Sequence, residues 1–324
     1  MPPLAPRCCA AWWLGRRSSL LLPAVRAAGS SSCCAATRAQ STVAALPDRI
    51  VRFVDETGEE LWGALDVTES RARVVRRGAA SGKMELADEW RSVDSILPPV
   101  DPPAVFCVGL NYADHAAEVK MAPPRTPIVF TKTVNTLTGH RSAIVIPAVA
   151  SQPAEVDYEA ELAVVIGREA KDVPVARALE YVAGFTIAND VTARRWQGKR
   201  GGGQWTRGKC FDTFLPLGPW VVPPSRVNLA DCKIRTWLNG DLVQDGNTSQ
   251  MLFSVPQLIA FLSQGTTLLP GTVILTGTPA GVGYTRGVYL KAGDDIRIAI
   301  DGIGSLCNPV AAELAGGEGL VQTA

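Results

Sequence analysis

The sequence lacks the features of several large protein classes. No stretch approaches the ~18 consecutive apolar residues of a membrane-spanning helix, and it contains no internal repeat or low-complexity tract. The net charge is only +1, which argues against a nucleic-acid binder that relies on a basic surface. With 47% hydrophobic and 19% charged residues among 324, the chain has instead the composition of a protein with a substantial core.

Acidic residues are missing from the chain before Asp48. The same stretch holds five arginines, no lysine, and many serines and alanines. This composition is typical of an organelle transit peptide, so we predict a mitochondrial matrix leader over residues 1–46. A secretory signal is the alternative, but its apolar centre at residues 20–25 is short and is followed directly by Arg26.

Cysteine and histidine are sparse in the rest of the chain. Four of the eight cysteines lie in the predicted leader, and the other four form no C-x-x-C pair. A disulfide framework is therefore not expected, and a reducing compartment fits this usage. The only histidines are His115 and His140.

Short β-like runs predict a mainly β fold with few helices. Residues 50–54 and 61–65 flank a turn and predict a hairpin, whereas residues 71–100 are more polar and end in a proline-rich breaker. The Asn239-Gly240 pair predicts a second hairpin with a type I′ turn. Further strands are expected at residues 105–109, 128–130, 144–146, 161–166 and 185–188, and helices at 112–120, 175–182 and 255–263. We expect a small N-terminal domain and linker at 47–103, a main domain at 104–315 and a tail at 316–324.

Acidic residues next to two apolar strands predict a cation site. Glu159 and Glu161 have the i, i+2 spacing that places both side chains on one face of a strand, and Asp190 follows another strand. Adjacent carboxylates near a core are costly without a cation, and an all-oxygen set favours a hard ion such as Mg²⁺ or Mn²⁺. A solvated strand edge is the equally weighted alternative for the two glutamates.

A histidine and a glutamate form a second candidate site. His115 and Glu118 are three residues apart and share one face of the predicted helix. A carboxylate beside an imidazole orients the ring and raises its basicity, as a general base requires. A surface or helix-capping histidine is the alternative.

Two glycine-rich segments could contact a substrate. Residues 203–209 fit G-x-x-x-x-G-K, but Cys210 stands where a phosphate-binding loop needs Ser or Thr, so we interpret Lys209 as a cation facing an anionic substrate. The preceding glycines at 198–203 indicate either a lid or a surface loop. At residues 274–283 a strand enters a glycine-rich turn, whose N–H groups and hydroxyl can hold a carboxylate unless it is a plain β-turn.

Together and in this order, these segments resemble the fumarylacetoacetate hydrolase family over about residues 105–310. The resemblance implies a mixed β-sandwich roll of the fumarylacetoacetase C-terminal type with short helices, beside a small N-terminal β domain, and a homodimer. It implies that Glu159, Glu161 and Asp190 bind Mg²⁺, and that His115 and Glu118 form a dyad on a lid helix. It also implies that Gln197 and Lys209 form a polar pair facing the substrate. Further substrate contacts are implied for Arg194, Thr278 and Lys132, although Thr133 follows Lys132 where the family often has proline.

The segment 208–219 and the N-terminal extension are most similar to the mitochondrial branch of this family. That similarity implies oxaloacetate keto–enol tautomerisation, with a small 2-oxo dicarboxylate as substrate and neither nucleic acid nor membrane as a partner. We hypothesise that Mg²⁺ chelates the C1 carboxylate and the C2 oxygen and stabilises the enolate, while His115 with Glu118, and Lys209 with Gln197, move the proton at C3. An acylpyruvate hydrolase or an oxaloacetate decarboxylase would use the same residues, and a non-catalytic binding protein is the hypothesis from a different class.

Overall fold

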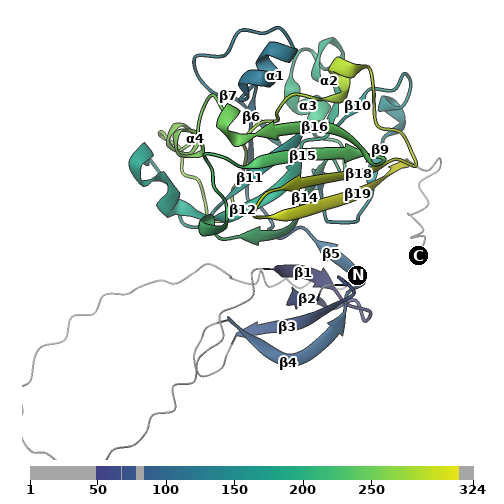
Figure 1. Cartoon of the computed structure of the whole chain (residues 1–324), viewed down its shortest axis with the longest axis vertical. Coiled ribbons are helices and arrows are strands. Elements are labelled where there is room, and N and C mark those ends of the chain that lie inside the picture. Colours follow the sequence, from purple (N-terminus) through teal and green to yellow (C-terminus); the bar gives the residue numbers. More distant parts are fainter. Residues whose placement is uncertain (1–48, 67, 78–83, 314–324) are drawn as a thin grey trace, which may run out of the picture. The chain divides into compact units, whose positions relative to one another are not determined.

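The computed structural model describes residues 49–66, 68–77 and 84–313. The predicted leader at 1–46 and the tail at 316–324 lie outside these residues. Strands dominate the described part and the α-helices are short, as predicted (Figure 1). No helix in that part is both long and apolar enough to cross a bilayer.

The N-terminal segment forms a five-stranded sheet in the order β4-β3-β2-β1-β5. Its strands are β1 (Ile50–Val54), β2 (Glu60–Leu65), β3 (Arg71–Arg77), β4 (Met84–Ser92) and β5 (Ser95–Leu97). The predicted hairpin is confirmed as β1 and β2, but the polar segment that follows, for which the sequence predicted no element, also forms strands. On β3, Ala72, Val74 and Val75 are buried whereas Arg71 and Arg76 are exposed, and a register shift between Arg73 and Val75 interrupts the alternation that would mark a strand.

A mixed seven-stranded sheet forms the centre of the main domain, in the order β7-β6-β17-β11-β12-β14-β8. Its strands are β6 (Val105–Gly109), β7 (Ile128–Lys132), β8 (Leu137–Thr138), β11 (Ala160–Ile166), β12 (Val182–Asn189), β14 (Leu215–Val222) and β17 (Val273–Leu275). Strand β11 is buried on both faces, with Leu162 and Val164 in one apolar cluster and Ala163 and Val165 in another. This two-sided burial explains its unbroken apolar sequence.

A second five-stranded sheet packs against the central one, in the order β16-β15-β18-β19-β9. Its strands are β9 (Ile144–Ile146), β15 (Lys233–Leu238), β16 (Asp241–Asn247), β18 (Asp295–Ile300) and β19 (Gly304–Ala312). Ile234 and Ile298 of this sheet share an apolar cluster with Leu162 of the central sheet, as the predicted sandwich requires. The type I′ hairpin is confirmed, because Asn239 and Gly240 have φ angles of 54° and 90°.

The connecting elements are short. A two-stranded ladder pairs β10 (Val156–Asp157) with β13 (Thr192–Ala193), and the helices are α1 (Ala113–Glu118), α2 (Arg194–Gln197), α3 (Trp205–Lys209), α4 (Val255–Leu262) and α5 (Gly283–Arg286). The helices predicted at 112–120 and 255–263 are thus confirmed as α1 and α4, with α1 shorter than expected. The one predicted at 175–182 is instead a 3₁₀ helix over Val175–Tyr181.

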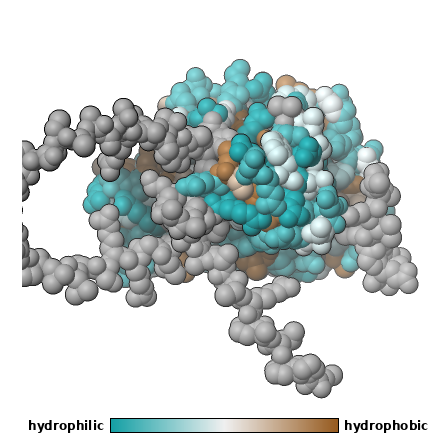
Figure 2. Space-filling model, turned by 90° about the horizontal axis from the view of Figure 1, so that it is seen from below, coloured by the Kyte–Doolittle hydropathy of each residue, from teal (hydrophilic) through white to brown (hydrophobic). Residues whose placement is uncertain are grey.

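Charged side chains form ion pairs on the N-terminal sheet. In Figure 2, which views the molecule from below Figure 1, hydrophilic residues dominate the coloured atoms. On β3 and β4, Arg76 Nη2 lies 2.9 Å from Glu89 Oε2, and Arg91 Nε lies 2.7 Å from Glu89 Oε1. These ion pairs are partly open to solvent, in contrast to those of the main domain described below.

Candidate active site

Three acidic side chains meet where β11 begins and β12 ends. Ala160 pairs with Asn189, so Glu159 and Asp190 are brought side by side, and the Asp190 N–H donates to the Glu159 carbonyl at 2.8 Å. One carboxylate oxygen from each of Glu159, Glu161 and Asp190 lies within 4.8 Å of the others. The three residues are 6%, 1% and 0% exposed, which excludes the solvated edge that the sequence left open.

Two buried lysines neutralise part of this cluster. Lys209 Nζ donates to Glu159 Oε2 and to Asp190 Oδ2, both at 2.7 Å, and to Thr192 Oγ1 at 2.8 Å. Lys132 Nζ donates to the other oxygen of Asp190, Oδ1, at 2.7 Å. Each oxygen of Asp190 therefore accepts a charge-assisted hydrogen bond from a different lysine, which fixes the plane of its carboxylate.

An arginine connects the cluster to a fourth carboxylate. Arg194, the first residue of α2, places Nη1 2.7 Å from Glu159 Oε1 and Nη2 2.6 Å from Asp157 Oδ2. Its Nη1 also donates to Gln197 Oε1 at 3.1 Å. Asp157 in turn accepts from the N–H groups of Gly283 and Tyr284, which fix its carboxylate. The Arg194 guanidinium therefore lies between two positioned carboxylates, Asp157 and Glu159.

Among the described residues, Glu161 is the member of the cluster that forms no ion pair. It accepts the Gly277 N–H at 2.5 Å, and no cationic side chain among the described residues pairs with it. Burial, followed by the charges of Asp190 and Glu159, raises the pKa of Glu161 well above its usual value. Burial also opposes ionisation of Glu159, but Lys209 and Arg194 outweigh it and lower the pKa of Glu159 to about 2.

The donor set fits a divalent cation. Three convergent carboxylates offer only oxygen ligands, which is the chemistry of Mg²⁺ and Mn²⁺ sites. A buried carboxylate that forms no ion pair, as observed for Glu161 among the described residues, is stabilised if a metal ion supplies positive charge. The structure thus brings together all three residues that the sequence analysis expected to bind metal.

The predicted His–Glu pair is present on α1. His115 Nδ1 and Glu118 Oε2 are 2.9 Å apart, and the His115 side chain is 12% exposed. The other oxygen of Glu118, Oε1, accepts the Gly281 N–H at 3.0 Å and the Thr285 hydroxyl at 2.7 Å. A carboxylate held in this way orients the imidazole through Nδ1 and leaves Nε2 as the nitrogen that can exchange a proton with a substrate.

The glycine-rich turn after β17 holds carboxylates, but they are the protein's own. The backbone N–H groups of Gly277, Gly281 and Gly283 donate to Glu161, Glu118 and Asp157, in that order. These three N–H groups are therefore already bonded to carboxylates of the protein. The turn instead ties the acidic cluster, the His–Glu pair and the partner of Arg194 into one unit.

The remaining predicted substrate contacts also face protein groups. Lys209 and Lys132 are 1% and 3% exposed and are bonded to the cluster, so neither presents an open ammonium group to solvent. Gln197 accepts from Arg194 Nη1 through its Oε1 at 3.1 Å. Thr278 is 5% exposed and accepts from Gln244.

Sequence reasoning missed several residues that support the site. Asp157 has the same i, i+2 spacing to Glu159 that marked Glu161, so that signal was available. Thr285 and Gln244 have no such local signal, because their partners lie far away in the sequence.

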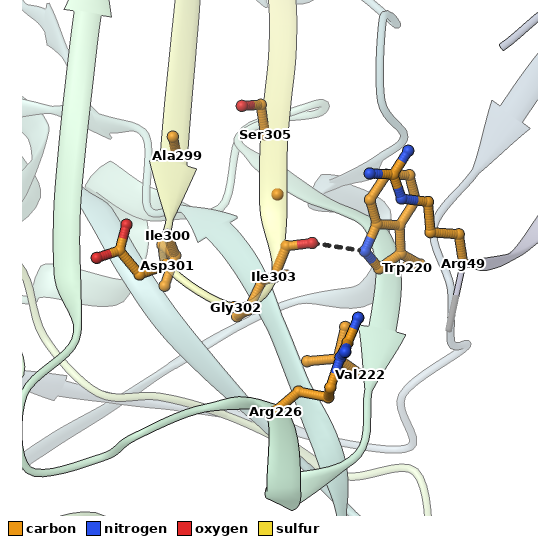
Figure 3. A pocket seen from close by; sticks show the side chains of 11 residues that line it. Arg49, Trp220, Val222, Arg226, Ala299, Ile300, Asp301, Gly302, Ile303 and Ser305 are labelled. Atoms are coloured by element: carbon orange, nitrogen blue, oxygen red, sulfur yellow. Dashed lines mark hydrogen bonds between the residues drawn. The ribbon is translucent and has the colours of Figure 1, made fainter. Parts of the chain in front are cut away.

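A separate hollow of about 380 Å³ lies at the end of β14 (Figure 3). Arg49, Trp220, Arg226 and Asp301 line it, and the Trp220 indole N–H donates to the Ile303 carbonyl at 2.8 Å. None of the predicted site residues lines this hollow, and the Asp301 carboxylate there is paired with Arg235. It is therefore distinct from the acidic cluster.

Comparison with known proteins places this architecture among related sequences. Residues 104–311 match the family model described as fumarylacetoacetate (FAA) hydrolase C-terminal. A human protein named oxaloacetate tautomerase FAHD2A, mitochondrial, is 45% identical over 250 residues, covering 76% of this chain and 78% of that protein. The Xenopus laevis oxaloacetate tautomerase fahd2, mitochondrial, is 44% identical over 250 residues, covering 76% of each.

Solved structures with the same fold include members of this family. A 5-carboxymethyl-2-hydroxymuconate delta-isomerase from Mycobacterium smegmatis superposes with a TM-score of 0.68 at 38% identity, over 82% of this chain and 99% of that one. A fumarylacetoacetate hydrolase from Exiguobacterium antarcticum superposes with a TM-score of 0.70 at 36% identity, over 82% and 99%. Both isomerases and hydrolases are thus built on this fold.

Proposed function

This chain belongs to the fumarylacetoacetate hydrolase family, and from that premise we propose that it is a magnesium-dependent oxaloacetate keto–enol tautomerase. The observation that carries the proposal is the buried acidic triad whose member Glu161 has no cationic partner among the described residues. Names of relatives support the reaction, because the human and Xenopus proteins are both called oxaloacetate tautomerases.

Glu159, Glu161 and Asp190 would hold the metal ion. When bound, a divalent cation supplies positive charge for the oxygens of a 2-oxo acid and so favours the enolate over the neutral forms. Lys209, Lys132 and Arg194 offset the other negative charges of the site, which matters because the substrate is itself a dianion. We therefore assign the two lysines a role in charge balance and in orienting Asp190.

His115 is the group that we assign to proton transfer. Tautomerisation removes a proton from the C2 hydroxyl and adds one to C3, so it needs a group that can both accept and donate a proton. The Glu118 carboxylate would stabilise the imidazolium that forms when His115 accepts a proton. Lys209 is not suited to this step, since all three of its ammonium hydrogens are donated to protein oxygens and its pKa is raised by Asp190 and Glu159 against the effect of burial.

The proposal is tested by following the absorbance of enol-oxaloacetate with purified protein. We expect rapid loss of the enol without release of pyruvate, abolished by a chelator and restored by Mg²⁺. Acetylpyruvate cleavage is measured in parallel. Cleavage of acetylpyruvate by a protein that leaves the enol decay at its spontaneous rate would overturn the tautomerase and favour the hydrolase.

The two histidines supply a matched pair of variants. His115→Gln should lower the catalysed rate ~10²- to 10⁴-fold, the usual contribution of a positioned acid–base group. His140→Gln changes the same residue type outside the site, where His140 Nδ1 accepts the Cys307 N–H, and should keep the wild-type rate. Equal losses in both variants would remove His115 from the mechanism.

We also propose import into the mitochondrial matrix and a homodimeric state. The acid-free, arginine-containing stretch 1–46 supports import, as do relatives whose names include "mitochondrial". Loss of import on deletion of residues 1–46, and a dimer mass by light scattering, are the expected results. The division into segments 1–46, 47–103, 104–315 and 316–324 stays a prediction.

A further inference from the structure

A buried amide connects the two halves of the site. Gln244 on β16 is 1% exposed, and its side chain makes four hydrogen bonds. Its Oε1 accepts the Ala160 N–H at 3.2 Å and the Thr236 hydroxyl at 2.9 Å. Its Nε2 donates to Thr278 Oγ1 at 2.9 Å and to the Pro279 carbonyl at 3.0 Å.

The backbone partners determine which way this amide points. The Ala160 N–H can only donate and the Pro279 carbonyl can only accept, so Oε1 must face Ala160 and Nε2 must face Pro279. If the amide were flipped, Nε2 would face the Ala160 N–H, donor against donor, and Oε1 would face the Pro279 carbonyl, acceptor against acceptor. The bond to Thr278 therefore has a defined direction, in which the hydroxyl oxygen is the acceptor.

Thr278 is left with a hydrogen to donate. Thr278 is only 5% exposed, and among the described residues no acceptor takes the hydrogen of its hydroxyl. Because its oxygen already accepts from an amide, the hydroxyl is polarised as a donor. An oxygen that carries negative charge is the partner that such a donor prefers.

Thr278 is linked to the acidic cluster on both sides of the Gln244 contact. The preceding residue, Gly277, donates its N–H to Glu161 in the acidic cluster. Ala160, which Gln244 contacts through Oε1, lies between Glu159 and Glu161. Gln244 thus sets the spacing between the strand that carries the acidic cluster and the turn that carries the hydroxyl.

We propose that Gln244 is a positioning residue that holds the Thr278 hydroxyl as a hydrogen-bond donor toward a carboxylate of the bound 2-oxo acid. This inference rests on the proposed function, because it assumes that such an acid binds beside the cluster. Gln244 itself does not touch the substrate. It acts by making Thr278 a donor and by keeping it at a fixed distance from the two glutamates.

The test is a double-mutant cycle read by oxalate binding. Oxalate is a non-reacting dicarboxylate, and its Kd is measured by calorimetry with Mg²⁺ present on wild type, Gln244→Met, Thr278→Val and the double variant. Removing a hydrogen bond to a charged group should weaken oxalate about 10-fold or more in each single variant. The double variant should be no weaker than the weaker single one, because both changes remove the same interaction. The KM for enol-oxaloacetate should rise in step with the oxalate Kd.

Two controls separate positioning from a general effect on folding. Thr278→Ser keeps the hydroxyl and should bind oxalate within about 3-fold of wild type. Thr236→Val removes one hydrogen bond to Gln244 Oε1 but leaves both bonds of Nε2, so its oxalate Kd should also stay within about 3-fold of wild type. If Gln244→Met does not fold, Gln244→Glu replaces it in the cycle, since Glu keeps the two acceptor contacts and loses the amide donor.

The outcomes of the cycle are distinct. Losses that multiply in the double variant, or a wild-type protein that does not bind oxalate with Mg²⁺, would overturn the role of Gln244. Coupled losses of oxalate affinity in a protein that does not accelerate enol decay would support the role of Gln244 while rejecting the tautomerase.

Discussion

Ion pairs in two regions of this protein have similar lengths but differ in their surroundings. On the N-terminal sheet, Glu89 pairs with Arg76 and Arg91 at 2.9 and 2.7 Å, and the Glu89 side chain is 32% exposed. In the acidic cluster, Lys209 pairs with Glu159 and Asp190 at 2.7 Å, with Asp190 fully buried. The distances are nearly the same, whereas the access to water is not.

The difference shows that distance alone does not indicate what an ion pair contributes. In the exposed group, water and salt replace a lost partner at little cost. In the buried group, each charge has been removed from water, so its partner cannot be lost without leaving an uncompensated charge. The arrangement around Asp190 is therefore restrictive: each of its oxygens is bonded to one lysine.

The largest expected effect comes from removing the buried cation. Lys209→Met leaves Glu159 and Asp190 without a shared donor, and we expect a loss of ~3–5 kcal/mol in the free energy of unfolding. Mg²⁺ should restore more stability in this variant than in the wild type, because an added cation replaces the missing charge. Urea denaturation with and without Mg²⁺ measures both effects. The matched variant is Arg76→Met on the N-terminal sheet, and an equal loss there would contradict the contrast.

The His–Glu pair lies between these two extremes, since the Glu118 side chain is 20% exposed. Glu118→Gln removes the charge that stabilises the imidazolium and should lower kcat by about 10²-fold. Thr285→Val removes only one hydrogen bond to Glu118 Oε1, leaving the Gly281 N–H in place, and should cost less than ~10-fold. Steady-state kinetics on both variants checks this order, and a larger loss for Thr285→Val would show that the carboxylate charge is not what matters.

His140 extends the comparison to a titrating group beside the N-terminal sheet. Burial lowers the pKa of His140, against the opposing effect of Glu69. The unfolded chain then binds a proton at a higher pH than the folded protein does. Stability is fully present above the ordinary histidine pKa of ~6.5 and falls as the pH drops through it. Urea midpoints measured from about pH 8 to pH 5 should show this decline, and His140→Gln should reduce it. An unchanged slope in that variant would assign the pH dependence to other groups.

The smallest effect is expected on the exposed sheet. Glu89→Gln removes the charge shared by Arg76 and Arg91, yet both arginines remain accessible to water. The melting temperature should stay close to that of wild type, and any difference should vanish as salt is added. A large, salt-independent loss would mean that these pairs are part of a rigid network and that the contrast between the regions is weaker than the burial indicates.

Local patterns in the sequence predicted those parts of the fold that depend on neighbouring residues. The hairpin around Asn239-Gly240 follows from two residues that accept positive φ, and β11 from an unbroken apolar run. Strands β3 and β4 were not predicted, because their sequences are rich in polar residues and a register shift between Arg73 and Val75 interrupts the alternation of β3. The helix expected at 175–182 became a 3₁₀ helix, a distinction that periodicity over so few residues does not make.

The sequence by itself determined the chemical content of the site: an i, i+2 pair of glutamates, an aspartate after a second strand, and a His–Glu pair on one helix face. Only the tertiary structure decided how these groups are partnered. Lys209 is 50 residues from Glu159, and Lys132 is 58 residues from Asp190. Such pairs form because the sheets bring distant strands together, and once buried the charges must find partners wherever the fold supplies them. For that reason the lysines and backbone N–H groups that were expected to face a substrate bind the protein's own carboxylates instead.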